Sequence, residues 1–179
     1  MPSEITLPET KPALEWVNGR VLQKVSPKRK HSLAQTRFAA ALDGWSRASG
    51  RGLVGTEWRF HVQPPGEARR PLIPDVAFLS YASLSFEVQQ VTDEPAIAPS
   101  AVVEVLSPGD RREDVEEKIR VYLAAGSSVI FLVDTERETV RVRDARGERS
   151  LTADQTLGHE TLPGFRLQVS DLFSMPTPK

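Results

Sequence analysis

One stretch of the chain, from Ala101 to Gly126, joins a pattern typical of a buried strand to one typical of an amphipathic helix. Its first six residues, 101–106, are apolar except for Glu104. Ser107-Pro108-Gly109 interrupts this run, and apolar residues then recur at helical spacing as far as Gly126. A carboxylate in a buried strand costs free energy unless something compensates its charge, so Glu104 is the first candidate for chemistry.

The predicted helix carries a lysine at an unusual position. Asp110 and Glu113 have the spacing of a capping box at its start. Lys118 lies at the margin of the apolar stripe, whereas most charged residues of the helix fall on its solvated face. Because few residues join the strand and the helix, Lys118 could lean back toward Glu104. A metal ion held by Glu104 would explain the buried charge, and the ammonium of Lys118 would orient an attacking water.

A second interpretation of the same stretch needs no chemistry. Asp114 and Lys118 stand at i and i+4, the spacing of an ordinary helix ion pair worth a few tenths of a kcal/mol. Glu104 would then be a strand-end carboxylate close to solvent. The stretch taken alone leaves both interpretations open.

Alternation and turn residues predict the other elements. Asn18-Gly19 is a strong turn signal, which predicts a hairpin over Leu14–Val25. Ser32 is expected to cap a helix that ends at Gly50. A strand, a helix and a second strand between residues 101 and 133 predict a parallel crossover. Four further runs predict strands, the last of them at a sheet edge: Leu53–Gln63, Ile73–Leu79, Val129–Val133 and Thr139–Arg143.

Length and composition narrow the class of protein. A chain of 179 residues with 39% hydrophobic and 26% charged residues fits one soluble globular domain. We expect an α/β fold with a central mixed sheet flanked by helices, in which residues 1–12 form a loose arm and residues 13–179 a single domain. No apolar run exceeds five residues, which predicts no spanning helix, no membrane partner and a cytoplasmic location.

The chain contains no cysteine, and this restricts its chemistry. Disulfides, thiolate nucleophiles and cysteine metal sites are all excluded. Any metal ion would be held by carboxylates, carbonyls or the three histidines. Oxygen donors of this kind favour hard ions such as Mg²⁺ or Mn²⁺.

Positive charge is concentrated near the N-terminus although the net charge is −1. Between Lys24 and Arg51, seven basic residues stand against one acid, Asp43. Such a patch suits the phosphate backbone of a nucleic acid, and its densest part is Lys28, Arg29 and Lys30. A solvated face balanced by acids folded nearby is equally compatible with the charges.

Several short motifs match one family nearly from end to end. Pro74-Asp75-Val76-Ala77 precedes Val103-Glu104-Val105-Leu106-Ser107-Pro108, and a helix with Asp114, Lys118, Tyr122 and Gly126 follows. The flanking motifs are Glu15 with Asn18-Gly19, Ser26-Pro27 with His31, Leu162-Pro163-Gly164-Phe165 and Asp171-Leu172-Phe173. Together these motifs resemble the bacterial restriction endonuclease family of the Uma-two type, within the PD-(D/E)XK nuclease superfamily. Leu106 stands where the superfamily has its lysine, and the resemblance assigns that role to Lys118.

The resemblance implies a restriction-endonuclease-like core and a metal-dependent endonuclease that acts on DNA as a homodimer. Asp75 and Glu104 would hold Mg²⁺ or Mn²⁺, with the carbonyl of Val105 as a further ligand. Lys118 would orient the attacking water or stabilise the charge that develops in the transition state.

Four more residues have a role in the predicted site. Glu57 is a candidate third carboxylate, or else a surface strand residue paired with a cation such as Arg59. His31 would contact the phosphate or the leaving oxygen, or else cap a helix at the surface. Asp114 would hold Lys118 in place, and Tyr122 would pack in the core with its hydroxyl near the site.

Three classes of function stay open. A metal-dependent endonuclease is favoured because Asp75, Glu104 and Lys118 are all present. A nucleic-acid-binding module could keep the nuclease fold without cleavage, although such a protein usually loses one of these residues. A hydrolase for another substrate, or a structural dimer, could use the same scaffold, since a fold does not determine a function.

Overall fold

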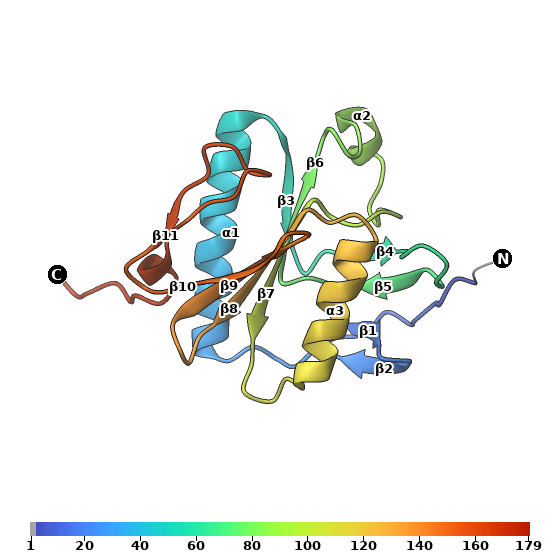
Figure 1. Cartoon of the computed structure of the whole chain (residues 1–179), viewed down its shortest axis with the longest axis horizontal. Coiled ribbons are helices and arrows are strands. Elements are labelled where there is room, and N and C mark those ends of the chain that lie inside the picture. The colour runs from blue at the N-terminus through green and yellow to red at the C-terminus, as the bar shows by residue number, and fades with distance from the viewer. Residues whose placement is uncertain (1–2) are drawn as a thin grey trace.

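The computed structural model describes residues 3–179 and shows a six-stranded mixed sheet with helices on both faces (Figure 1). The strand order across this sheet is β10-β9-β8-β7-β6-β3. β7 and β8 are parallel, as predicted for a crossover through the intervening helix, and all other neighbours are antiparallel. The strands are β3 (Gly52–Thr56), β6 (Val76–Ser80), β7 (Ala101–Leu106), β8 (Val129–Asp134), β9 (Thr139–Asp144) and β10 (Gly147–Leu151).

The two faces of the sheet are covered by different helices. α1 (Arg29–Ser49) packs Phe38 against one face, and α3 (Arg112–Ala124) packs Ile119 against the other. Successive side chains of a strand point to opposite faces, so Val103 joins the α1 side of the core and Val102 the α3 side. The same alternation turns Glu104 toward α3.

Smaller elements complete the two layers. The predicted hairpin is present as β1 (Leu14–Val17) and β2 (Arg20–Gln23), with Asn18 and Gly19 both at positive φ, 51° and 73°. Positive φ at both turn residues is what the tightest hairpin turn requires. The other elements are β4 (Phe60–Val62) paired with β5 (Arg70–Leu72), α2 (Phe86–Gln89), β11 (Thr156–Leu157) paired with β12 (Leu167–Gln168), and a 3₁₀ helix (Val169–Leu172).

The predicted arm, residues 1–12, begins with two residues that lie outside the described part of the chain. From residue 3 onward the arm crosses Arg69: Glu4 forms an isolated bridge to it, and the Ile5 N–H donates to its carbonyl at 2.8 Å. Within residues 3–179, no helix has both the length and the apolar composition needed to cross a membrane.

Two strand predictions are wrong in their extent. Leu53–Gln63 is not one strand, because β3 and β4 belong to different sheets and Glu57 between them has a φ of 50°. A residue in the left-handed region turns the chain and ends the pairing. The strand predicted over Ile73–Leu79 begins only at Val76, which leaves Asp75 just outside it.

The alternation of Thr139–Arg143 predicts an edge strand, and this prediction is wrong because β9 lies inside the sheet. β10 pairs outside it, and β10 has mostly exposed residues that give no hydrophobic signal.

The predicted helix starts are also wrong. α1 begins at Arg29, before Ser32, and α3 follows Arg111 without a side-chain cap. The Asp110 carboxylate instead accepts a hydrogen bond from the Ser107 N–H at 2.8 Å, which orders the loop between β7 and α3.

Two glycines test how tightly the sheet is packed. A Cβ built at Gly52 would overlap the backbone oxygen of Leu79, whereas one built at Gly44 in α1 would meet nothing within 4 Å. Gly52→Ala should therefore destabilise the fold by about 1–3 kcal/mol, as overpacking does. Gly44→Ala should stabilise it by about 0.5–1 kcal/mol, because alanine favours the helix. Urea denaturation measures both, and equal effects would contradict the packing around β3.

Candidate active site

Asp75 and Glu104 are brought together by neighbouring strands. β6 and β7 pair with Val76 opposite Val103, which places Asp75, one residue earlier, beside Glu104. The N–H of Val105 donates to Asp75 Oδ2 at 2.7 Å and fixes the orientation of that carboxylate. Both side chains are nearly inaccessible, with 3% and 12% of their surface exposed. Two carboxylates are thus buried side by side where two antiparallel strands meet.

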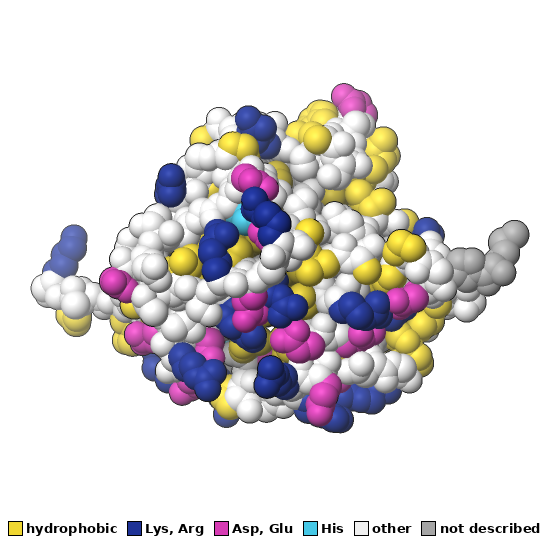
Figure 2. Space-filling model, in the orientation of Figure 1, with side chains coloured by type: hydrophobic (Ala, Val, Ile, Leu, Met, Phe, Trp, Pro, Cys, Tyr) yellow, Lys and Arg dark blue, Asp and Glu magenta, His cyan; other side chains and the backbone are white. Residues whose placement is uncertain are grey.

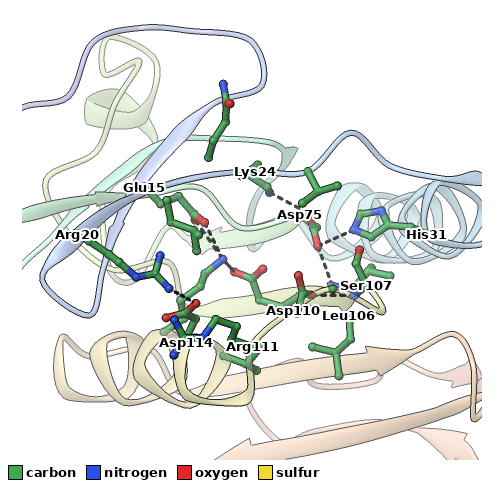
Figure 3. A pocket seen from close by; sticks show the side chains of 18 residues that line it. Glu15, Arg20, Lys24, His31, Asp75, Leu106, Ser107, Asp110, Arg111 and Asp114 are labelled. Atoms are coloured by element: carbon green, nitrogen blue, oxygen red, sulfur yellow. Dashed lines mark hydrogen bonds and ion pairs between the residues drawn. The ribbon is translucent and has the colours of Figure 1, made fainter.

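The Asp75 carboxylate is held by a lysine and a histidine from other elements. Lys24, which follows the hairpin, places its Nζ 2.8 Å from Asp75 Oδ1 and donates to the Ile73 carbonyl at 2.8 Å. His31, in the first turn of α1, has its Nε2 3.3 Å from Asp75 Oδ2. Figure 3 shows Lys24 and His31 reaching the carboxylate from different elements.

Glu104 is paired with the lysine of the following helix. Lys118 Nζ lies 2.7 Å from Glu104 Oε1, so the predicted lean of Lys118 toward β7 is confirmed. The same ammonium lies 3.1 Å from both oxygens of Glu15, a carboxylate on β1 with only 2% of its surface exposed. The Tyr122 hydroxyl donates to Glu104 Oε1 at 3.5 Å. Lys118 therefore connects the hairpin, the central strand and the helix.

Burial and charge move the pKa values of the two carboxylates in opposite directions. Burial raises the pKa of Glu104 to about 7, with Asp75 and Glu15 adding to the effect and Lys118 only partly offsetting it. Burial would also raise the pKa of Asp75, but its hydrogen bond to His31 and the charges of Lys24 and His31 outweigh this and lower it. Asp75 is therefore ionised at neutral pH, whereas Glu104 exchanges a proton there.

The cations and the phenol respond to the same charges. Burial alone would lower the pKa of Lys24, Lys118 and His31, but the neighbouring carboxylates raise all three. Burial raises the pKa of Tyr122, and the negative charge of Glu104 adds to this. Both lysines are thus charged and Tyr122 is a neutral donor.

These side chains line a cavity of about 410 Å³ between the hairpin, β7 and α3 (Figure 3). The hairpin is tied to α3 across this cavity, because Asn18 Nδ2 and Arg20 Nη2 donate to the Asp114 carboxylate at 2.8 and 2.5 Å. The charged groups that line it are Glu15, Arg20, Lys24, His31, Asp75, Glu104, Asp110, Arg111, Asp114 and Lys118.

Asp114 occupies a different place from the one predicted, whereas Glu57 agrees with its alternative interpretation as a surface residue paired with a cation. Asp114 does not hold Lys118: its partners are Arg20 and Asn18, so it fixes the hairpin instead. Among residues 3–179 no ion pair joins Asp114 to Lys118. Glu57 is not among the residues lining the cavity; its side chain is 47% exposed and lies 3.0 Å from Lys24.

Glu15 and Lys24 contact the central charged groups of the site, and the sequence patterns give neither of them a role. Glu15 and Val17 are the buried residues of β1, so the hairpin turns an acidic side chain inward. Lys24 is the first residue of the basic stretch between Lys24 and Arg51. The available signal for Glu15 was its place in the hairpin motif, and nothing in the sequence distinguished Lys24 from its basic neighbours.

The predicted nucleic-acid contacts, Lys28, Arg29 and Lys30, are exposed and immediately precede His31. Lys30 pairs with Glu136 at 3.1 Å, and Arg29 Nη1 lies 3.2 Å from the sulfur of Met175. Figure 2 shows basic and acidic side chains interspersed over the face that it presents, without a continuous basic surface.

Comparisons with known proteins agree with this architecture. A crystal structure of a protein from Anabaena variabilis ATCC 29413, described as "a putative nuclease belonging to DUF820", matches with a TM-score of 0.82. The two sequences are 24% identical, and the match covers 93% of each chain, which shows a shared fold. The chain matches no curated protein. The model of the Uma2 family, described as "Putative restriction endonuclease", matches residues 4–170, and the chain therefore belongs to the Uma2 family.

Proposed function

We propose that the protein is a metal-dependent endonuclease that hydrolyses phosphodiester bonds of DNA. The observation that carries the proposal is the placement of Asp75 and Glu104 in one cavity, with Lys118 Nζ 2.7 Å from Glu104. Two carboxylates beside one ammonium are the groups that metal-assisted phosphoryl transfer requires. The family description agrees with this reaction.

The donor atoms of the cavity suit Mg²⁺ or Mn²⁺. Among residues 3–179, no group of three His, Asp or Glu residues is placed to hold a metal ion. Mg²⁺, however, keeps several waters and is usually held by only one or two carboxylates. The three carboxylates of the cluster, Glu15, Asp75 and Glu104, also outnumber the two lysines beside them, which leaves room for a further positive charge. We infer that Asp75 and Glu104 hold the ion, with the carbonyl of Val105 as a third ligand.

Each protein group then has a defined task. A divalent ion supplies Lewis acidity and a lower pKa for bound water. Lys118, held between Glu104 and Glu15, directs N–H donors toward the attacking water or the developing phosphate charge. Lys24 and His31 keep Asp75 ionised and oriented. Lys28, Arg29 and Lys30 contact the phosphate backbone outside the cavity.

Plasmid nicking tests the reaction. Purified protein with Mg²⁺ or Mn²⁺ should nick supercoiled DNA, and Asp75→Asn or Glu104→Gln should reduce the rate by at least about 100-fold, as loss of a group that stabilises transition-state charge does. Glu160→Gln is the matched control, because Glu160 is exposed, pairs with Arg146 and does not line the cavity.

The same nicking assay, applied to Glu57→Gln, tests whether Glu57 is a third metal-binding carboxylate. A loss for Glu57→Gln as large as that for Asp75→Asn would place it among the metal ligands; a change below tenfold would make it a partner of Lys24. Undiminished nicking by Glu104→Gln would refute the proposed role of the carboxylates. Binding of DNA without any nicking would favour a protein that keeps the fold without cleavage.

Metal binding should depend on pH through Glu104. A metal ion and a proton compete for its carboxylate, whose pKa is about 7 in the folded protein. The apparent affinity for Mn²⁺ should therefore rise by up to about tenfold per unit as pH approaches 7 and level off above it. Calorimetric titration from about pH 5.5 to 8 measures this. In Glu104→Gln the affinity should be weaker and nearly independent of pH, and an unchanged pH profile would exclude Glu104 as a ligand.

In the metal-free protein, the free energy of unfolding should fall as pH rises toward 7, whereas the affinity for the metal ion rises. Because the folded pKa of Glu104 lies above its ordinary value of 4.5, the folded state retains a proton that the unfolded state has lost. This contribution to stability is complete below pH 4.5 and is lost as pH rises through about 7. His31, whose pKa is also raised, acts in the same direction, so only part of the trend should disappear in Glu104→Gln.

A further inference from the structure

The cavity is larger than its proposed chemistry requires. At about 410 Å³ it falls in the range of pockets that enclose a small organic molecule, about 300–1,000 Å³. A phosphate group and a hydrated metal ion would leave part of this volume unused. The remaining volume is therefore large enough for further atoms of a substrate beyond its phosphate group.

The lining of the cavity is of two chemically different kinds. One part is the charged cluster around Asp75 and Glu104. The other part is aliphatic and consists of Leu22, Val25, Leu106 and Val115. A phosphate gains nothing from an aliphatic wall, whereas the sugar and the face of a base do. Val25 is 68% exposed, so this wall offers apolar surface that an occupant could bury.

The mouth of the cavity is bounded on two sides by elements that are tied together. The bonds from Asn18 and Arg20 to Asp114 hold the hairpin to α3, while the carboxylates of Asp75 and Glu104 lie recessed and nearly inaccessible. A base that is paired and stacked in a duplex would have to leave the stack to reach the aliphatic wall, which costs unpairing energy. A base in a single strand avoids that cost.

The surface charge also disfavours an extended duplex contact. The net charge is −1, and Lys28, Arg29 and Lys30 form only a short exposed basic segment beside the cavity, in which Lys30 also pairs with Glu136. A protein that binds a duplex mainly through phosphates neutralises many of them at once. Inside the cavity, Lys24 and Lys118 lie beside carboxylates whose charge the proposed metal ion would neutralise, so their ammonium groups could serve one or two phosphates.

We propose that the cavity receives one whole unstacked nucleotide, with its phosphate on the charged side and its base or sugar on the aliphatic side. This inference rests on the proposed function and specifies its substrate class as single-stranded nucleic acid, DNA or RNA, in preference to intact duplex. The aliphatic wall makes the preference independent of sequence, because it offers apolar contact rather than hydrogen bonds to base edges.

Binding to matched oligonucleotides tests this directly. Fluorescence anisotropy with the full chain in Ca²⁺ would compare four probes of 20 nucleotides: single-stranded DNA, single-stranded RNA, the same DNA as a blunt duplex, and an abasic DNA strand. The abasic strand carries the same phosphates without bases. Single-stranded DNA or RNA should bind at least tenfold more tightly than both the duplex and the abasic strand.

Two valines of the hairpin region provide matched variants. Val25 lines the cavity, whereas Val21 is 49% exposed and is not among its lining residues. Val25→Ser should weaken single-strand binding at least threefold and leave abasic-strand binding unchanged, and Val21→Ser should change neither. Both positions are exposed, so melting curves should show that each variant is folded.

The possible results separate this inference from the proposed function. Equal binding of the duplex and the single strand, or equal binding of the abasic strand, would overturn the inference while leaving an endonuclease in place if the duplex is nicked in Mn²⁺. Absence of binding and cleavage for all four probes would overturn both. A single strand that is bound tightly and cleaved in Mn²⁺, with Val25→Ser impaired, would support both.

Discussion

The structure depends on compensating three buried carboxylates in one part of the core. Glu15, Asp75 and Glu104 lie almost out of reach of solvent, and burial of an ionised carboxylate without a partner costs several kcal/mol. Lys24 and Lys118 supply the compensation from the segments flanking the sheet. The folded arrangement of hairpin, strand and helix is therefore also the arrangement that assembles the site.

The lysines do not compensate the negative charge of the carboxylates completely, and the remaining charge bears on the proposed reaction. Asp75 has Lys24 and His31 as partners and remains ionised, whereas Glu104 shares one ammonium with Glu15 and burial raises its pKa to about 7. Neighbouring carboxylates with separated pKa values recur in functional sites, where burial and charge partners adapt each group to its task. The residual negative charge is what a divalent cation would neutralise in the proposed reaction.

The parts of the site that could be predicted from sequence are those joined by short connections. Glu104 and Lys118 belong to one strand–loop–helix unit, so periodicity alone placed them near each other. Glu15 lies on the hairpin and Lys24 directly follows it, and no local pattern relates this distant segment to β7 and α3. The division of the predicted strand at Glu57 follows from a single positive φ, which a sequence pattern does not record. The position of β9 inside the sheet depended on β10, whose polar residues resemble a loop.

The most direct test of this account is a double-mutant cycle on the free energy of unfolding, measured by urea denaturation without metal. Lys118→Met should cost about 3–5 kcal/mol, because it leaves Glu104 and Glu15 buried without their cation. Adding Glu104→Gln to Lys118→Met should restore a substantial part of that loss, since the uncompensated charge is removed with it. A cost below about 1 kcal/mol for Lys118→Met, or strictly additive effects of the two changes, would contradict the central role of this charge cluster.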